Sequence, residues 1–459
     1  MTRPPPGSAT STCANGKKVE DDAIAVRTGI AMDARTYEYW LGPKEMKYSA
    51  SGVERSVKPG ATIRRAQAVL DVIGVTKVAD VTDLDRVGIP NFMTVRPHDI
   101  GPGISYYNGK GTTRAAAHAG ALMEAIERHA GERYDGEMIA SSHHNLRSEY
   151  PCVDPNEIHV PMIRKYSEHL MLEWVMGYDL MTHRPTLAPL NCVVSPYDPD
   201  SGLALFYSST NGLASGNTRV DAICHALCEV IERDATALAM ARADIRPAVA
   251  GLLADMGFGL SAEVEEAPLI SLSGLPRPAT ALVRKLQRAG LEVELLDLTS
   301  PAGIATIACT ITDPLGPPDV INAFSGCGTH PDARIALTRA LTEAAQSRLS
   351  CIQGGRENLP DYAPAKGTPL VKAKHRSRRT ISFDDIASYP HASVNDDVEF
   401  MIERLRQSGF EQVVVVDVTS KEVGIPVVRV IVPRSEMWTL YVAEGSRASL
   451  GPRALQQVR

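Results

Sequence analysis

Two segments of this 459-residue chain end in the same pattern of acids and a base, Glu-x-x-Glu-Arg. The first, from Gly111, reads GTTRAAAHAGALMEAIERHA, and the second, from Gly216, reads GNTRVDAICHALCEVIERDA. Eleven of the twenty aligned positions are identical. A looser third segment, from Gly328, carries Glu343 and Gln346 at the same three-residue spacing. The acids in these patterns are Glu124, Glu127, Glu229, Glu232 and Glu343.

The spacing of these acids predicts a metal site. Residues three apart lie on one face of a helix, so each Glu-x-x-Glu pair presents two carboxylates together. Mg²⁺ prefers a few carboxylates with phosphate oxygens and waters, whereas zinc would require His or Cys at ligand spacing. One such pair is typical of charges on a helix that is kept for packing. The duplication with matching flanks favours carboxylates from three helices that converge on one metal-bound phosphate.

The residues before each helix favour phosphate binding. The glycine that opens each segment precedes an expected helix N-terminus, where unpaired amides and the helix dipole attract anions. Lys110 adds a cation at the first of these ends, and Thr112 or Thr113 is the expected N-cap there. Neither a P-loop nor a G-x-G-x-x-G after a strand is present. The histidines show no convincing pairing with Ser or Cys, and His330 is expected to cap or pack rather than to catalyse.

Composition limits the class of protein. The hydrophobic share of 44%, the charged share of 22% and the net charge of −6 fit a globular protein without nucleic acid or an anionic membrane as partner. No apolar run is long enough to cross a bilayer, and the amino-terminal residues lack a signal-peptide stretch. Residues 1–22 are expected to be a mobile tail. The eight cysteines show no C-x-x-C spacing, which indicates a reducing, cytoplasmic location.

The rest of the chain predicts an α+β domain. We expect helices at 63–75 and 112–134 and strands between 172 and 213. A second repeat relates LVRKLQRAGLEVELLDLTSPAGIATIACTIT, from Leu282, to MIERLRQSGFEQVVVVDVTSKEVGIPVVRVIVP, from Met401. Each copy reads as helix, Gly, strand, Asp-x-Thr-Ser, turn and strand. Such repetition favours one domain with internal pseudo-symmetry over unrelated domains.

The motifs resemble those of the YcaO superfamily. The resemblance rests on GKGTT…MEAIER, LASGNT…CEVIERDA and GTHPDARIALTRALTEAAQSR, and covers about 105–356, with a looser match to the carboxyl end. It implies a YcaO-like fold of internal pseudo-repeats, with mixed sheets and helices packed around a central ATP site. Residues 23–459 would be one catalytic domain, with the ATP-site core at about 105–356 and an α/β segment at about 380–459.

The resemblance also implies ATP and Mg²⁺ as cofactors and assigns roles to residues. The metal ligands would be Glu124, Glu127, Glu229, Glu232 and Glu343. The phosphate contacts would be Lys110, Thr113, Arg233 and Arg339, with Asn217 and Gln346 near the nucleoside or phosphates. The catalytic residues would be Arg233, Arg339 and Glu343. One position departs from the family, because Gly120 stands where relatives usually carry Ser.

The resemblance implies ATP-dependent activation of a peptide backbone amide. The segments VPRSE, at 432–436, and GPRA, at 451–454, are similar to those of the branch that forms thioamides with a TfuA-type partner and an external sulfur source, although Arg434 replaces an expected Gly. The partners would be a peptide or protein substrate, a TfuA-like protein and a sulfur donor, and a homodimer is left open. One alternative is an azoline-forming cyclodehydratase, which the lack of a Pro-rich carboxyl end disfavours. The other is a non-catalytic, ATP-binding accessory factor.

Overall fold

The computed structural model describes residues 36–50, 53–97, 105–158, 166–197, 203–206, 208–256, 266–315, 322–354, 378–437 and 451–458. The tail predicted for residues 1–22 lies outside these ranges. Residues Asp33–Arg459 cluster as one compact unit. No helix in the described ranges is both long and apolar enough to span a membrane.

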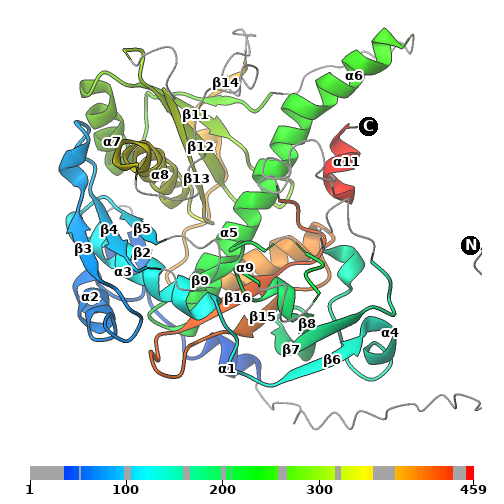
Figure 1. The fold of residues 1–459 in the computed structure, drawn as a ribbon. Helices are drawn as coiled ribbons and strands as arrows, with labels where there is room; N and C mark the ends of the chain where they lie inside the picture. Colours follow the sequence, from blue (N-terminus) through cyan, green and yellow to red (C-terminus); the bar gives the residue numbers. More distant parts are fainter. Residues whose placement is uncertain are drawn as a thin grey trace, which may run out of the picture. The chain divides into compact units, whose positions relative to one another are not determined.

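Three sheets place the three motif helices (Figure 1). The first sheet has the order β3 (Lys77–Asp80), β4 (Asn91–Val95), β5 (Tyr106–Lys110). The second has the order β13 (Ala323–Thr329), β12 (Thr306–Thr312), β11 (Glu292–Asp297), β10 (Leu269–Ile270), β14 (Thr380–Ile381). The third has the order β6 (Met138–Ser142), β7 (Met171–Asp179), β15 (Val414–Asp417), β16 (Val427–Ile431), β9 (Leu213–Ser215), with β8 (Arg184–Pro189) paired to β7. In these sheets the described ladders are antiparallel, except for the parallel pair β10–β14.

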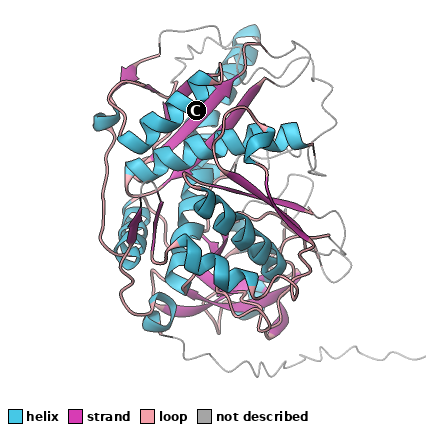
Figure 2. Cartoon of the chain, turned by 90° about the vertical axis from the view of Figure 1, so that its left-hand side faces the viewer, coloured by secondary structure: helices cyan, strands magenta, loops and turns pink. Residues whose placement is uncertain are grey.

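The motif helices pack on these sheets (Figure 2). The motif helices are α3 (Arg114–Gly131), α5 (Arg219–Met240) and α8 (Ala333–Gln353). The other helices are α1 (Tyr37–Leu41), α2 (Pro59–Gln67), α4 (His143–Leu146), α6 (Arg246–Asp255), α7 (Arg277–Arg288), α9 (Val394–Gln407) and α11 (Pro452–Val458). Strands β1 (Tyr48–Ala50) and β2 (Val53–Arg55) form a separate antiparallel pair. Short 3₁₀ helices lie at Thr82–Leu84, Pro155–Glu157, Leu190–Cys192 and Phe383–Asp385, and a π-helix at Ala241–Ile245 joins α5 to α6.

The elements repeat the same arrangement. Each motif helix directly follows the strand that ends an antiparallel group of three: β5 before α3, β9 before α5 and β13 before α8. The repeat predicted at Leu282 and Met401 is confirmed as α7-β11-β12 and α9-β15-β16. The predicted α+β class is likewise confirmed.

Side-chain caps and glycines explain why these helices begin and pack as they do. The side chains of Thr113, Thr218 and Asp332 each accept a hydrogen bond from a first-turn amide of their helix. A Cβ at Gly109 of β5 would lie 2.0 Å from a backbone nitrogen of α3, and one at Gly326 of β13 would lie 2.2 Å from one of α8. Only glycine therefore lets these helices pack directly on their strands.

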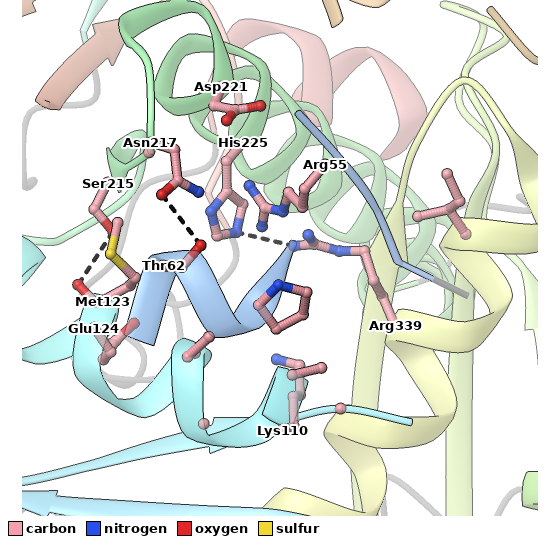
Figure 3. Close-up of a pocket in the computed structure, with 18 of the residues that line it drawn as sticks. Arg55, Thr62, Lys110, Met123, Glu124, Ser215, Asn217, Asp221, His225 and Arg339 are labelled. Atoms are coloured by element: carbon pink, nitrogen blue, oxygen red, sulfur yellow. Dashed lines mark hydrogen bonds between the residues drawn. The ribbon is translucent and has the colours of Figure 1, made fainter. Parts of the chain in front are cut away.

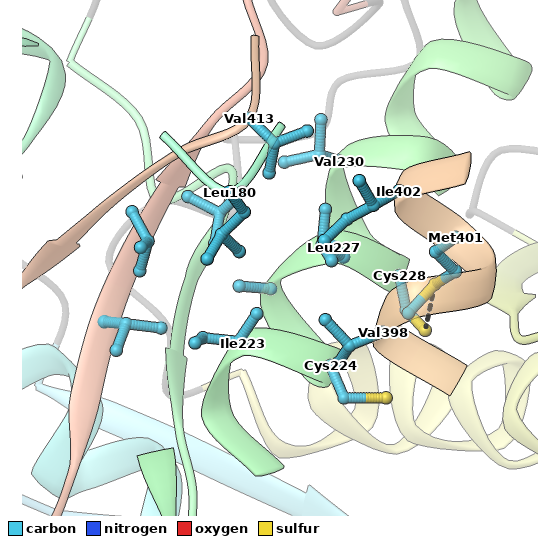
Figure 4. Close-up of a cluster of buried hydrophobic side chains, with 14 of the residues drawn as sticks. Leu180, Ile223, Cys224, Leu227, Cys228, Val230, Val398, Met401, Ile402 and Val413 are labelled. Carbon is cyan, nitrogen blue, oxygen red and sulfur yellow. Dashed lines mark hydrogen bonds between the residues drawn. The ribbon is translucent and has the colours of Figure 1, made fainter. Parts of the chain in front are cut away.

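The main core lies between α5, α9 and the six-stranded sheet (Figure 4). Ile223 and Leu227 of α5 pack with Val398 and Met401 of α9, and all four are buried. This packing fixes the position of α5. The helix predicted at 63–75 is observed as α2, which starts earlier because Pro59 suits a first helical turn. It ends at Gln67, and the apolar residues that extended the pattern form turns against the core.

Candidate active site

The predicted carboxylates of α3, α5 and α8 act on one another electrostatically. Burial and the carboxylates of Glu124 and Glu229 hold the pKa of Glu127 well above its ordinary value. Burial and Glu343 raise the pKa of Glu232 to about 7. Since these influences link all three motif helices, the predicted convergence of acids is present in the structure.

On α3 the acids have partners within the protein. Glu124 Oε1 accepts hydrogen bonds from Nε and Nη2 of Arg128, at 2.9 and 2.7 Å. Glu127 is 5% exposed, and its Oε2 accepts from the backbone N–H of Ser215 at 2.9 Å. Because Ser215 is the last residue of β9, this bond connects the first motif helix to the strand that leads into the second.

On α5 the matching acids are held more loosely. The Arg233 guanidinium lies 3.6 Å from Glu229. Glu232 is 6% exposed, and its Oε2 has no hydrogen-bond partner among the described residues. A buried carboxylate oxygen without a partner is costly, so this position fits a bound cation.

On α8, Glu343 is held by a cation. Its Oε2 lies 2.7 Å from Lys110 Nζ, and its Oε1 accepts from the Cys327 amide at 3.3 Å. Burial alone would raise the pKa of Glu343, but Lys110 and Arg233 outweigh burial and keep it below its ordinary value. Lys110, predicted to contact phosphate, therefore pairs here with a predicted metal ligand.

A cavity of about 230 Å³ opens beside these acids (Figure 3). Six predicted site residues line it: Lys110, Glu124, Glu127, Asn217, Arg339 and Gln346. Three acids lie outside its lining but act on residues that line it: Glu229, Glu232 and Glu343. Arg233 also lies outside the lining and acts on those three acids. Thr113 is not brought into the cavity. Its side chain instead caps α3 by accepting from the Ala116 amide at 3.1 Å, whereas its neighbour Thr112 lines the wall.

One end of the cavity is strongly cationic. The Arg339 guanidinium lies 3.2 Å from His225 Nε2 (Figure 3). Burial, Arg55 and Arg339, with Lys110, hold the pKa of His225 well below its ordinary value, so its ring is neutral. Three cations around one neutral ring are suited to a polyphosphate. Carboxylates beside them are suited to Mg²⁺, so the side chains fit both ATP and its metal.

Sequence reasoning missed part of this wall. Arg55 from β2 and Thr62 from α2 line the cavity, and Thr62 Oγ1 lies 3.1 Å from Asn217 Oδ1. Both residues lie far from the motifs along the chain, so no sequence pattern connects them to the site. A signal did exist for Asp221 and His225, which precede Glu229 at four-residue steps and therefore share its helix face.

A second cluster joins Cys224, His330 and Asp397, whose potential ligand atoms lie within 4.8 Å of one another. His330 Nδ1 accepts from the Asp332 amide at 2.9 Å, so its proton is on Nε2, which lies 3.4 Å from Asp397 Oδ2. With Nε2 protonated, the ring neither binds a metal nor deprotonates a thiol. Cys228 and burial also raise the pKa of the Cys224 thiol.

This cluster therefore serves structure. Lys47 Nζ lies 2.6 Å from Asp397 Oδ2, which already gives this buried carboxylate a counter-charge. The expectation that His330 caps or packs is confirmed, because it receives an amide at the start of α8. No histidine was expected to pair with a Ser or Cys nucleophile, and the Cys224 thiol near His330 keeps a raised pKa.

The two carboxyl-terminal motifs meet at the end of the second Glu-x-x-Glu-Arg segment. The Glu436 carboxylate accepts from the amides of Gly451, Arg453 and Ala454 at 2.9–3.0 Å, at the start of α11. Asp234, directly after Arg233, accepts from the Glu436 amide at 2.9 Å and from the Arg453 guanidinium. We call this arrangement of Asp234, Glu436 and α11 the carboxyl-terminal latch.

Comparison with known proteins agrees with this geometry. The family described as "YcaO cyclodehydratase, ATP-ad Mg2+-binding" matches residues 108–436. An uncharacterized protein of Methanothermobacter thermautotrophicus is 37% identical over 84% of this chain and 96% of its own length. An "Uncharacterized protein in tfuA 3'region" of Rhizobium leguminosarum bv. trifolii is 28% identical over 90% of this chain and 96% of its own length.

A solved structure resembles this one along most of the chain. YcaO from Methanopyrus kandleri, bound with AMPPCP and Mg²⁺, has a TM-score of 0.67 and 26% identity, covering 89% of this chain and 98% of that chain. The family match begins at residue 108. Arg55 and Thr62 of the cavity wall therefore come from a part of the chain that precedes it.

Proposed function

This chain belongs to the YcaO family, with ATP and Mg²⁺ as its cofactors, and from that membership we propose that it activates a peptide backbone amide. ATP supplies the phosphoryl group that takes up the amide oxygen and leaves with it as phosphate. The observation that carries the proposal is the meeting of three acid-bearing helices and three cations at one cavity.

The carboxylates would hold the metal. Those of Glu124, Glu127, Glu229, Glu232 and Glu343 form a donor set of hard oxygens, as Mg²⁺ requires. The raised pKa of Glu232 reflects burial and repulsion from Glu343. A divalent cation would offset that repulsion, so we assign both acids to the metal.

The cations would stabilise the charge that develops on the transferring phosphoryl group. Burial opposes the charge on Arg339, yet Glu232 keeps its pKa above the ordinary value, so it stays protonated. Neutral His225 holds one edge of this guanidinium at 3.2 Å. Arg233 is kept charged in the same way by Glu229. Both arginines are thus positioned before the nucleotide arrives.

We assign the nucleophile to an external sulfur source. Sulfur adds to the amide carbon, the amide oxygen departs as phosphate, and loss of the sulfur-bound proton leaves a thioamide. The support is the pairing of VPRSE with GPRA in the carboxyl-terminal latch and the likeness to a protein of a tfuA region. On this basis the partners are a peptide or protein substrate, a TfuA-like protein and a sulfur donor.

Calorimetry tests the amide-activation proposal first. We expect the intact chain to bind MgATP, and Glu229→Gln and Glu343→Gln to weaken binding strongly. When a candidate peptide and hydrosulfide are added, the protein should release ADP from ATP. The mass of the peptide should then change by the replacement of one oxygen by sulfur. An intact chain that ignores MgATP, or variants that bind as well as it does, would overturn the proposal and favour a non-catalytic accessory role.

One alternative has support of its own. The family description names a cyclodehydratase, which would use a Cys, Ser or Thr side chain of the peptide as nucleophile and form an azoline. Peptide-dependent ADP release without added sulfide, together with loss of one water from the peptide, would select this alternative. Either product would exclude the accessory role.

A further inference from the structure

A second cavity, of about 90 Å³, lies beside β16 and is separate from the cavity described above. Its lining includes Cys192, Phe206, Asn211, Val230, Arg429 and Met437. Most of these side chains are apolar or contain sulfur. Arg429 is the cation among the polar residues of this lining, and it is 4% exposed.

The contacts of Arg429 leave its charge without a counter-ion. Its Nε donates to the Cys192 carbonyl at 2.7 Å and its Nη2 to the Ser209 carbonyl at 2.5 Å. Its Nη1 has no hydrogen-bond partner among the described residues. Both acceptors are neutral, and burial lowers the pKa of Arg429 to about 10, which still leaves it protonated at neutral pH.

The nearest acids act at a distance. Glu157 lines the same cavity, but it is influenced by Arg434 and forms no ion pair with Arg429 among the described residues. Glu229 and Glu127 act on Arg429 only through space. A buried charge without a partner costs several kcal/mol, and a water molecule would satisfy Nη1 without neutralising it. An anion would do both.

The lining selects the kind of anion. Apolar and sulfur-containing walls disfavour strongly hydrated ions such as phosphate, and favour a small, polarisable monovalent ion. Asn211 Oδ1 also has no partner in the described part of the chain, so the wall offers a second hydrogen-bonding group. Hydrosulfide is small and polarisable, carries one proton to donate and one negative charge, and is formed near neutral pH.

The cavity also lies close to the acids of the site, because Arg429 of its lining is influenced electrostatically by Glu229 and Glu127. Val230, which lines it, directly follows Glu229. We propose that this cavity is a binding site for a small monovalent anion, and that, given the thioamide-forming reaction proposed above, the anion is hydrosulfide. Arg429 would neutralise it and Asn211 would orient it beside the amide-activating centre.

Binding without ATP or peptide tests this site directly. Sodium hydrosulfide is added anaerobically at increasing concentrations, and thermal unfolding is measured at each of them. The melting temperature of the intact chain should rise with the hydrosulfide concentration. Arg429→Gln should weaken hydrosulfide binding at least tenfold and Asn211→Leu about threefold. The matched control is Arg288→Gln, which removes the same charge from an exposed arginine of α7 that lines neither cavity and should leave binding within about twofold.

A second experiment needs no variant and so does not depend on how well the variants fold. Crystals of the intact chain are soaked in bromide. An anomalous peak within hydrogen-bond distance of Arg429 Nη1 would support the site. An empty cavity would overturn the proposed anion site, and so would equal hydrosulfide responses in the intact chain and Asn211→Leu. Bromide in the cavity without any response to hydrosulfide would show that the ligand is another anion. Because no nucleotide is used, failure here is distinct from a failure to bind MgATP.

Discussion

The two copies of Glu-x-x-Glu-Arg share a sequence but differ in their surroundings. On α3, Arg128 donates twice to Glu124, and Glu127 receives a backbone amide from β9. On α5, the arginine stands 3.6 Å from its glutamate, and Glu232 keeps an oxygen without a partner among the described residues. The first copy is therefore largely satisfied within the protein, whereas the second leaves a carboxylate oxygen available to the metal that we propose.

The difference continues one residue further. His129 follows the first copy, and Asp234 follows the second. Asp234 is bound by the Glu436 amide and the Arg453 guanidinium, which fix the end of the second motif from the outside. The same motif therefore has two structural roles. The first copy joins α3 to β9, and the second is held by the carboxyl-terminal latch and keeps an acid open to cations.

The largest effect should come from removing the open acid. Glu232→Gln should weaken MgATP binding about 100-fold, on the order of 3 kcal/mol, because a predicted metal ligand is lost. The same change relieves repulsion from Glu343, so the protein without nucleotide should melt at a higher temperature. Calorimetry and thermal unfolding of the same preparation measure both.

Glu124→Gln is the matched change in the first copy. It leaves the half-buried Arg128 without its full charge partner, so it should lower the melting temperature while also weakening MgATP binding. If both variants were destabilised equally, the contrast between a satisfied and an open copy would be wrong.

The pH dependence of stability should report next on the open acid, Glu232. The pKa of Glu232 is about 7 in the folded protein against an ordinary 4.5, so Glu232 is neutral in both states at low pH. As pH rises from 4.5 to 7 the unfolded state ionises first, and the folded protein loses stability, by up to about 3 kcal/mol. Without Mg²⁺, the advantage of Glu232→Gln in melting temperature should therefore grow from pH 5 to pH 8.

Magnesium provides the control for that prediction. Added Mg²⁺ should shrink the difference at pH 8, because the metal favours the charged carboxylate of the intact chain. A difference that stays constant with pH would show that Glu232 has an ordinary pKa.

A smaller effect should follow from opening the carboxyl-terminal latch. Glu436→Gln replaces a carboxylate that accepts from three amides, and should cost about 1–3 kcal/mol and a few-fold in MgATP affinity. Gly451→Ala should disrupt the same contact, since its Cβ would come within 2.4 Å of the Glu436 carboxylate. Leu455→Ala, on an exposed position of α11, is the control and should change neither quantity.

A latch that matters only for stability would lower the melting temperature and leave MgATP affinity unchanged. That outcome would separate the end of α5 from the geometry of the site, and both copies of the motif would then be positioned by their sheets alone.

The sequence predicted what repetition and local patterns encode. The motif helices, the second repeat and the acids that converge all follow from spacing that is visible in the chain. It could not predict Arg55 and Thr62, because the contact of residues so far from the motifs depends on tertiary packing. Nor could it show that Lys110 pairs with Glu343, since that bond depends on the distance between β5 and α8.

The threonine caps give the smallest effect and compare the copies most directly. Thr113 and Thr218 each accept one first-turn amide, from Ala116 at 3.1 Å and from Asp221 at 3.3 Å. Replacing either by Ala should cost about 1 kcal/mol of stability. Since neither hydroxyl lines the cavity, MgATP affinity should stay within about twofold. A tenfold loss in Thr113→Ala alone, measured by calorimetry on folded protein, would restore the phosphate contact that the sequence predicts. The first copy would then also depend on its ligand.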